Sequence, residues 1–175
     1  MRKMRKNLFT TTALVLTCVL IACSGLSSKQ RAAANDAVSA LRKLEAASQV
    51  KPSLMQYNQL VIEAKARVNE ASAVLPDGEL KQELNAAMDA YADAAVAWAA
   101  MERTYLRDDK EPGKTLGPKY GLYLKAENSS MVDYMESLER LTNPNYESPS
   151  TKGVLDKIWS VGKGHLDRAS SLIDR

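Results

Sequence analysis

The stretch ELKQELNAAMDAYADAAVAWAAMERTYL, residues 79–106, decides the fold of this chain. Its apolar side chains recur every three or four residues, the spacing that places them along one side of an α-helix. Such a helix would be about 40 Å long at a rise of about 1.5 Å per residue. The alanine-rich run 94–100 has little side-chain bulk and would let a neighbouring helix approach closely. Because charged residues flank that run on both sides, we expect a helix of a bundle and not a membrane span. The stripe expected to be buried comprises Leu80, Leu84, Ala87, Met88, Tyr91, Ala94, Ala95, Trp98, Met101 and Tyr105.

Other segments show the same helical periodicity, with apolar residues on one face and charged residues on the other. They span about residues 31–49, 54–75, 119–141 and 151–173. Clusters of proline, glycine and polar residues separate them, and the shortest connection, Pro76-Asp77-Gly78, makes its flanking helices antiparallel neighbours. No segment shows the alternation typical of a β-strand. The sequence therefore predicts an all-α fold, a four- or five-helix antiparallel bundle forming a single domain over residues 31–175.

Two local signals refine these helices. Ser53, followed three residues later by Gln56, predicts a capping box at the start of the second helix. Gly162 and Gly164 fall inside the last helix, where each costs about 1 kcal/mol relative to alanine. A kink or a close helix contact near His165 is the expected reason for these glycines.

The first 22 residues have the composition of a secretory signal, with four basic residues ahead of an apolar segment over residues 13–22. The segment is too short to span a bilayer, which takes about 20 apolar residues. It ends in Leu20-Ile21-Ala22-Cys23, which resembles the lipobox of bacterial lipoprotein precursors. The resemblance covers about residues 1–24. It implies cleavage between Ala22 and Cys23, a diacylglyceryl group on the nucleophilic sulfur of Cys23, and acylation of the new amine.

The resemblance also implies where the protein resides. In lipoproteins of this family an aspartate directly after the cysteine tends to hold the protein at the inner membrane, and here that position is Ser24. We therefore expect attachment to the membrane through lipid at Cys23, in the outer membrane and facing the periplasm. Residues 23–30 are expected to form a short tether ahead of the first helix.

The charge and cysteine content of the mature chain differ from those of the precursor. The formal charge of +3 includes four basic residues of the signal, so removing residues 1–22 gives 3 − 4 = −1. A near-neutral domain offers no general electrostatic attraction for nucleic acid. Cys18 is lost with the signal and Cys23 is committed to lipid, so no cysteine remains for a disulfide or a zinc site.

Motifs that would indicate catalysis or metal binding are incomplete. Gly113-Lys114-Thr115 resembles the end of a phosphate-binding loop, but Asp108 stands where that motif requires glycine. The two-metal sites of some bundles need paired Glu-x-x-His elements, and the sequence has only His165, without the glutamate. Asp89 and Asp93 share a helix face and are expected on its solvated side. We therefore expect no catalytic residue, no metal site, no cofactor and no enzymatic activity.

The remaining candidate site is a set of aromatic side chains at or beside the expected helix contacts. Their flat apolar faces and hydroxyl groups could line a small-molecule pocket between helices, with haem on His165 and a methionine as a special case. Alternatively, they fill a core from which phenylalanine is absent, and His165 donates to a nearby oxygen. The sequence favours this structural interpretation. The candidate pocket comprises Tyr57, Tyr91, Trp98, Tyr105, Tyr134 and His165.

Together these features predict a lipid-anchored envelope protein whose helical bundle is a non-catalytic protein-interaction or scaffolding module. Its expected partner is another envelope protein. That partner could use the groove around the alanine-rich helix or the loop 108–118, because binding residues often lie on loops carried by a rigid scaffold. The alternative is a small-ligand carrier, with haem as one possible ligand, that uses the aromatic pocket.

Overall fold

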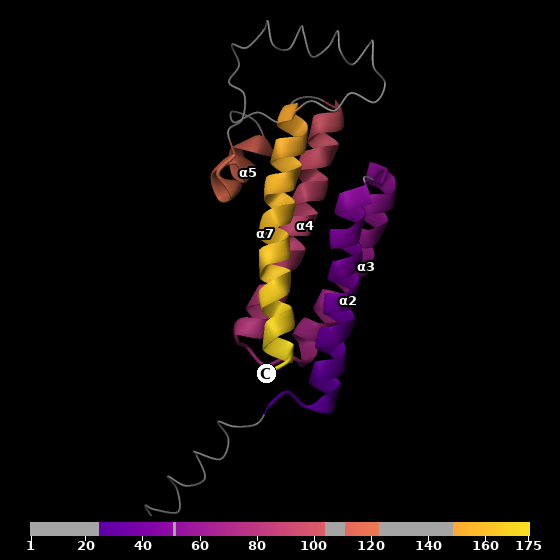
Figure 1. Ribbon diagram of the computed structural model, residues 1–175, viewed down its shortest axis with the longest axis vertical. Coiled ribbons are helices and arrows are strands. Elements are labelled where there is room, and N and C mark those ends of the chain that lie inside the picture. The colour runs from indigo at the N-terminus through magenta and orange to yellow at the C-terminus, as the bar shows by residue number, and fades with distance from the viewer. Residues whose placement is uncertain (1–24, 51, 104–110, 123–148) are drawn as a thin grey trace, which may run out of the picture.

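The computed structural model describes residues 25–50, 52–103, 111–122 and 149–175. Four long helices account for most of these residues, together with one short helix, α5 (Gly113–Tyr120). Successive long helices run in opposite directions, so the predicted all-α antiparallel bundle is confirmed (Figure 1). The long helices are α2 (Ser28–Val50), α3 (Leu54–Val74), α4 (Glu79–Arg103) and α7 (Pro149–Ile173).

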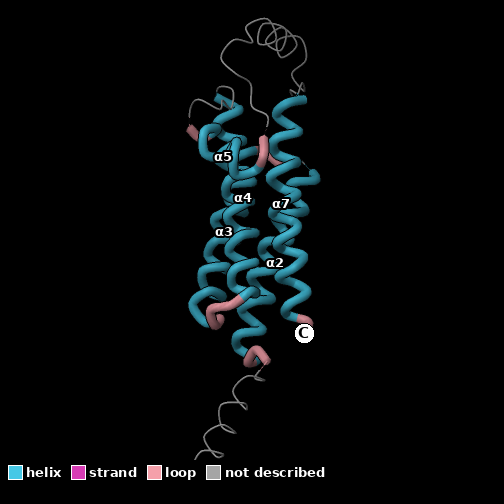
Figure 2. Tube along the Cα trace, turned by 90° about the vertical axis from the view of Figure 1, so that its left-hand side faces the viewer, coloured by secondary structure: helices cyan, strands magenta, loops and turns pink. Residues whose placement is uncertain are grey.

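The four long helices surround one core in the order α2, α3, α4, α7. α4 packs most extensively on α7, and α2 on α3. The start of α2, the connection between α3 and α4, and the end of α7 lie together at one end of the bundle (Figure 1). α5 lies near the opposite end, beside α4 and α7 (Figure 2).

Capping boxes start the first two helices. The predicted one at Ser53 is confirmed: Gln56 N donates to Ser53 Oγ at 3.2 Å, and Ser53 N donates to Gln56 Oε1 at 3.0 Å. Ser27 and Gln30 form a second box, with distances of 3.3 and 2.9 Å. α2 therefore begins at Ser28, and the predicted end of the tether at residue 30 was wrong, because residues 28–30 belong to the helix.

The buried stripe of α7 differs from the sequence prediction. The helical spacing of residues 151–173 predicts that Val161 and His165 face inward, but in the structure both are only partly buried, whereas Leu166 is fully buried. The buried positions run through Ile158, Gly162 and Leu166 at intervals of four. Gly162 has no apolar side chain, so the sequence gives no sign that this position is buried. The prediction therefore placed the buried face of α7 at Val161 and His165 instead.

A close contact between α4 and α7 explains Gly162. An added Cβ at Gly162 would lie 3.3 Å from Ala90 Cβ and 3.3 Å from both Cε2 and Cζ of Tyr91. Ala94 and Ala97 lie on the same face of α4 as Ala90, and all three are buried. The predicted close helix contact is thus confirmed, and the alanine-rich face packs within the chain itself.

Gly162 and Gly164 of α7 give a matched stability test. At Gly164 an added Cβ would meet only the flexible end of Arg168, at 3.6 Å. We expect Gly164→Ala to raise the free energy of unfolding by about 1 kcal/mol, because alanine is the better helix former. Gly162→Ala should lack that gain, because Ala90 and the Tyr91 ring would have to move. Urea unfolding followed by circular dichroism measures both, and equal gains would contradict the close contact.

The predicted loop 108–118 and the predicted start of the fourth helix at residue 119 were both wrong in detail. The helix α5 already begins at Gly113. Its Leu116 and Tyr120 lie one turn apart and are both buried, so this short helix has an apolar face. It ends at Gly121, which takes the left-handed conformation at φ 59° that glycine tolerates best. The rest of the expected helix, to residue 141, lies outside the described residues.

Candidate functional site

Three aromatic side chains from three helices meet inside the bundle. Tyr57 of α3 lies with its ring centroid 5.7 Å from that of Trp98 of α4 and 6.0 Å from that of Trp159 of α7. The two tryptophans are 6.1 Å apart in an edge-to-face arrangement, at 76°. Such geometry adds about 0.5–1.5 kcal/mol per pair beyond the burial of area. We call Tyr57, Trp98 and Trp159 the aromatic cluster.

The polar group at the centre of the aromatic cluster is satisfied by the protein. Tyr57 Oη accepts a hydrogen bond from Trp159 Nε1 at 2.9 Å and donates one to the backbone oxygen of Tyr91 at 3.2 Å. Tyr57 is fully buried, and this burial raises the pKa of its hydroxyl, although the bond from Trp159 opposes the shift. The hydroxyl therefore stays neutral and serves as donor and acceptor at once. Its hydrogen-bonding capacity is used in joining three helices.

Tyr91 precedes Trp98 by seven residues on α4, but its side chain has different neighbours. Its side chain is fully buried against Gly162, and its hydroxyl has no hydrogen-bond partner among the described residues. Burial raises the pKa of this hydroxyl, and the nearby carboxylate of Glu45 raises it further. A neutral phenol thus fills the space between α4 and α7.

His165 belongs to a separate, partly exposed ion-pair group. Its Nδ1 lies 2.7 Å from Glu83 Oε2, and Arg168 Nε donates to the same oxygen at 3.0 Å. Burial raises the pKa of Glu83, but the bonds from His165 and Arg168 outweigh it and hold the pKa below its ordinary value. On α7, His165 follows Trp159 by six residues, about 9 Å along the axis, and lies about a third of a turn away from it around the helix. His165 and the aromatic cluster therefore do not share a site.

The structure thus divides the predicted pocket. It brings Tyr57 and Trp98 together and places Tyr91 next to them, but it leaves His165 elsewhere; Tyr105 and Tyr134 lie outside the described residues. The sequence reasoning missed Trp159. A signal was present, since Trp159 stands four residues after Leu155, which is buried on the same helix.

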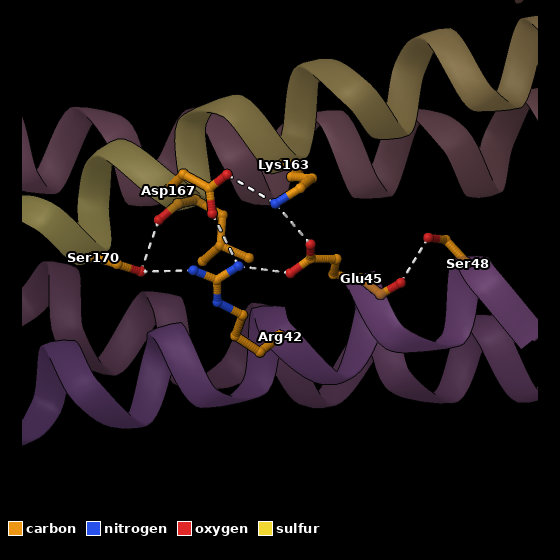
Figure 3. A network of polar contacts seen from close by, with 7 residues as sticks. Arg42, Glu45, Ser48, Lys163, Asp167 and Ser170 are labelled. Atoms are coloured by element: carbon orange, nitrogen blue, oxygen red, sulfur yellow. Dashed lines mark hydrogen bonds and ion pairs between the residues drawn. The ribbon is translucent and has the colours of Figure 1, made fainter.

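A ring of alternating charges, made by Arg42, Glu45, Lys163 and Asp167, joins α2 to α7 (Figure 3). Arg42 Nη1 contacts Glu45 Oε2 at 2.7 Å and Asp167 Oδ1 at 2.9 Å. Lys163 Nζ contacts Glu45 Oε1 at 3.0 Å and Asp167 Oδ2 at 2.8 Å. Ser170 Oγ lies 3.4 Å from Arg42 Nη2. Two cations and two anions balance, so the ring links helices and does not select a charged ligand.

The charge ring predicts a loss of stability in acid. The pKa of Glu45 is raised by burial but lowered more by Arg42 and Lys163, and that of Asp167 is lowered chiefly by Lys163. A lowered folded-state pKa stabilises the fold above the ordinary value, and that contribution is lost as the pH falls below about 4. Glu45→Gln should cost about 1–2 kcal/mol at neutral pH and make the acid loss shallower.

Urea unfolding at a series of pH values measures this effect. The matched control is Glu70→Gln, which breaks only an exposed contact of Glu70 with Arg67 at 2.9 Å within α3. The control should leave the pH profile unchanged. Identical profiles for Glu45→Gln and the unaltered protein would show that the charge ring does not stabilise the bundle.

α5 is attached to α4 through one carboxylate. Asp93 Oδ2 accepts hydrogen bonds from Lys119 Nζ at 2.6 Å and from Tyr120 Oη at 2.7 Å. Asp93 was expected on a solvated face together with Asp89. Asp89 is exposed, but α5 partly covers Asp93, which corrects that expectation. Lys114, Thr115 and Pro118 remain exposed on the outer side of α5.

A polar groove of about 230 Å³ lies between α2 and α3. Two of its charges pair across the helices, with Lys43 Nζ 2.7 Å from Glu63 Oε1. The lining residues are Asp36, Ser39, Ala40, Lys43, Glu63 and Arg67. Acids and bases thus balance in this groove, and no single charge class of ligand is favoured.

Comparison with protein-family models, curated protein sequences and solved structures finds no match to this chain. Among the helices that the structure describes, none is both long enough and apolar enough to cross a membrane. Nor do histidine, cysteine, aspartate and glutamate side chains gather there in a group of three or more that could hold a metal ion. The functional argument therefore depends on the residues of this chain alone.

Proposed function

We propose that this protein is a lipid-anchored envelope protein whose bundle acts as a non-catalytic interaction or scaffolding module at the periplasmic side of the outer membrane. The lipobox-like sequence Leu20-Ile21-Ala22-Cys23 supports the anchor. The single observation that favours a module over a carrier is the aromatic cluster, whose rings contact one another and whose central hydroxyl bonds to Trp159 and Tyr91. A ligand there would have to displace these contacts.

Of the two regions that the sequence suggested for a protein partner, one is covered within the bundle. The alanine-rich face of α4 packs against α7, which removes the proposed groove. The second proposed region, 108–118, includes the first part of α5, which is held on α4 by Asp93 and presents Lys114, Thr115 and Pro118 outward. We assign the partner surface to α5.

Native and denaturing mass spectrometry of the membrane-extracted protein tests this proposal. We expect a lipidated mass beginning at Cys23 and no additional adduct under native conditions. An adduct lost on denaturation would favour the small-ligand carrier instead. For haem, the carrier interpretation requires a Soret band that His165→Ala abolishes, but His165 already contacts Glu83.

Cross-linking in living cells tests the partner surface. A photoreactive residue at Lys114, on the exposed side of α5, should give a discrete protein adduct. The same residue at Lys65, exposed on α3, is the control and should give none. Equal adducts from both positions, or none from Lys114, would count against α5 as the contact surface.

A further inference from the structure

The chain becomes fixed to one end of the bundle directly after the expected lipid attachment point. Leu26 is partly buried and packs against the core. Gln30 takes part in the capping box with Ser27, and its Nε2 donates to the backbone oxygen of Val74 at 3.0 Å, at the end of α3. Arg31 donates to the backbone oxygen of Ile173, at the end of α7. The start of α2 is thereby tied to the ends of α3 and α7.

This attachment leaves very little free chain. Only Ser24 and Gly25 separate Cys23 from Leu26, and three extended residue steps reach about 10 Å. By contrast, α4 has 25 residues and is about 37 Å long. We call the end formed by Ser28, the connection 75–78 and Ile173 the proximal end (Figure 1). A lipid on Cys23 must lie close to the proximal end and far from α5.

We infer that the proximal end is the face of the bundle that lies on the lipid surface, and that the bundle projects away from it. α5 is then held about 20 Å from the proximal end, because Asp93, which contacts it, lies 14 residues beyond Glu79 on α4, about 21 Å along the axis. The inference rests on the proposed lipid attachment at Cys23. It gives the scaffolding role a geometry, in which a rigid spacer presents α5 at a fixed distance from the bilayer.

The sides of the bundle offer little to hold it flat on a membrane. Attraction to anionic lipids needs clustered basic residues, and Arg42, Lys43 and Lys163 pair with acids within the bundle. The charge ring neutralises the side formed by α2 and α7, and Lys43 pairs with Glu63 on the side formed by α2 and α3. The competing orientation would use α3, where Met55 and Ile62 are about 70% exposed and lie seven residues apart on one face.

Three labelled positions distinguish these orientations. The mature chain has no cysteine other than the lipidated Cys23, so each introduced cysteine is the only free thiol. Asp77→Cys places a fluorescent label at the proximal end, Ile62→Cys on the exposed side of α3, and Lys114→Cys on α5. All three positions are exposed, and unchanged circular dichroism would verify that each variant folds.

The full lipidated protein is inserted into preformed vesicles of phosphatidylethanolamine and phosphatidylglycerol that contain a headgroup-linked quencher. The quencher is chosen so that its range is shorter than the separation of about 21 Å between Glu79 and Asp93 along α4. Quenching should be several-fold stronger at Asp77 than at Ile62 or Lys114, because Ile62 lies 12 residues from the end of α3, about 18 Å from the proximal end. Equal quenching at all three positions, or strongest quenching at Ile62, would overturn the inference and leave the anchor intact. A mass without lipid would overturn the anchor itself, and the inference with it.

Discussion

Tyr57→Ala should lower the free energy of unfolding by about 3–5 kcal/mol, the usual range for deleting a large buried aromatic side chain. Tyr57 is fully buried and contacts both tryptophans of the chain. The substitution removes the ring that packs against Trp98 and Trp159 and also leaves the indole N–H of Trp159 without its acceptor. Because globular domains are stable by only about 5–15 kcal/mol, this single change should leave the bundle marginal.

Tyr57→Phe separates the contribution of the ring from that of the hydroxyl. It keeps the packing with Trp98 and Trp159 but removes the acceptor of the Trp159 hydrogen bond, so we expect a loss of about 1 kcal/mol. Urea unfolding monitored by tryptophan fluorescence and by circular dichroism measures both variants. If both substitutions left stability unchanged, Tyr57 would not be a structural residue, and the pocket interpretation would regain its support.

The helices were predictable from sequence because their signals are local. Apolar spacing, the Ser53 capping box and the short connection 76–78 each act within a few residues, and the structure contains the four long helices that they predict, α2, α3, α4 and α7. The residues at which the helices begin and end were predicted less accurately. Ser28 starts α2 earlier than expected because the cap at Ser27 carries no apolar residue to mark it.

The candidate site was harder to predict because it depends on the rotation of one helix against another. His165 and Trp159 both occur on α7, and the sequence pattern placed the histidine inward. Gly162 has no side chain and therefore does not appear in the apolar pattern. Its close contact with Ala90 and Tyr91 nevertheless fixes which face of α7 meets α4. Trp159 is thereby brought to Tyr57, and His165 to Glu83.

Interactions between distant segments carried no sequence signal at all. Arg42 and Asp167 are 125 residues apart, and Asp93 is 26 residues from Lys119, yet each pair is joined by a charged contact. Acids and bases are frequent throughout the chain, so their pairing follows only after the helices are placed. The same limit applies to α5, whose eight residues gain their stability from burial of Leu116 and Tyr120.

Cys23→Ser should abolish lipid attachment and release the protein from the membrane fraction. A serine hydroxyl cannot replace the thiolate that accepts the diacylglyceryl group, so the chain should accumulate unprocessed or soluble. The loss of lipid should be close to complete, because no other cysteine follows residue 23 in the chain. Membrane fractionation with intact mass measurement reports both the location and the lipid.

Cys18→Ser is the matched control, because it removes the other cysteine of the chain from within the expected signal. It should leave the lipidated mass and the membrane fraction unchanged. A Cys23→Ser protein that stayed in the membrane after a high-salt wash would mean that some other part of the chain holds it there. Release of the protein without loss of helical circular dichroism would instead show that location and folding depend on different parts of the chain. The lipid would then locate the bundle, and the packing around Tyr57 and Gly162 would keep it rigid. The proposed orientation of α5 at a fixed distance from the membrane requires both.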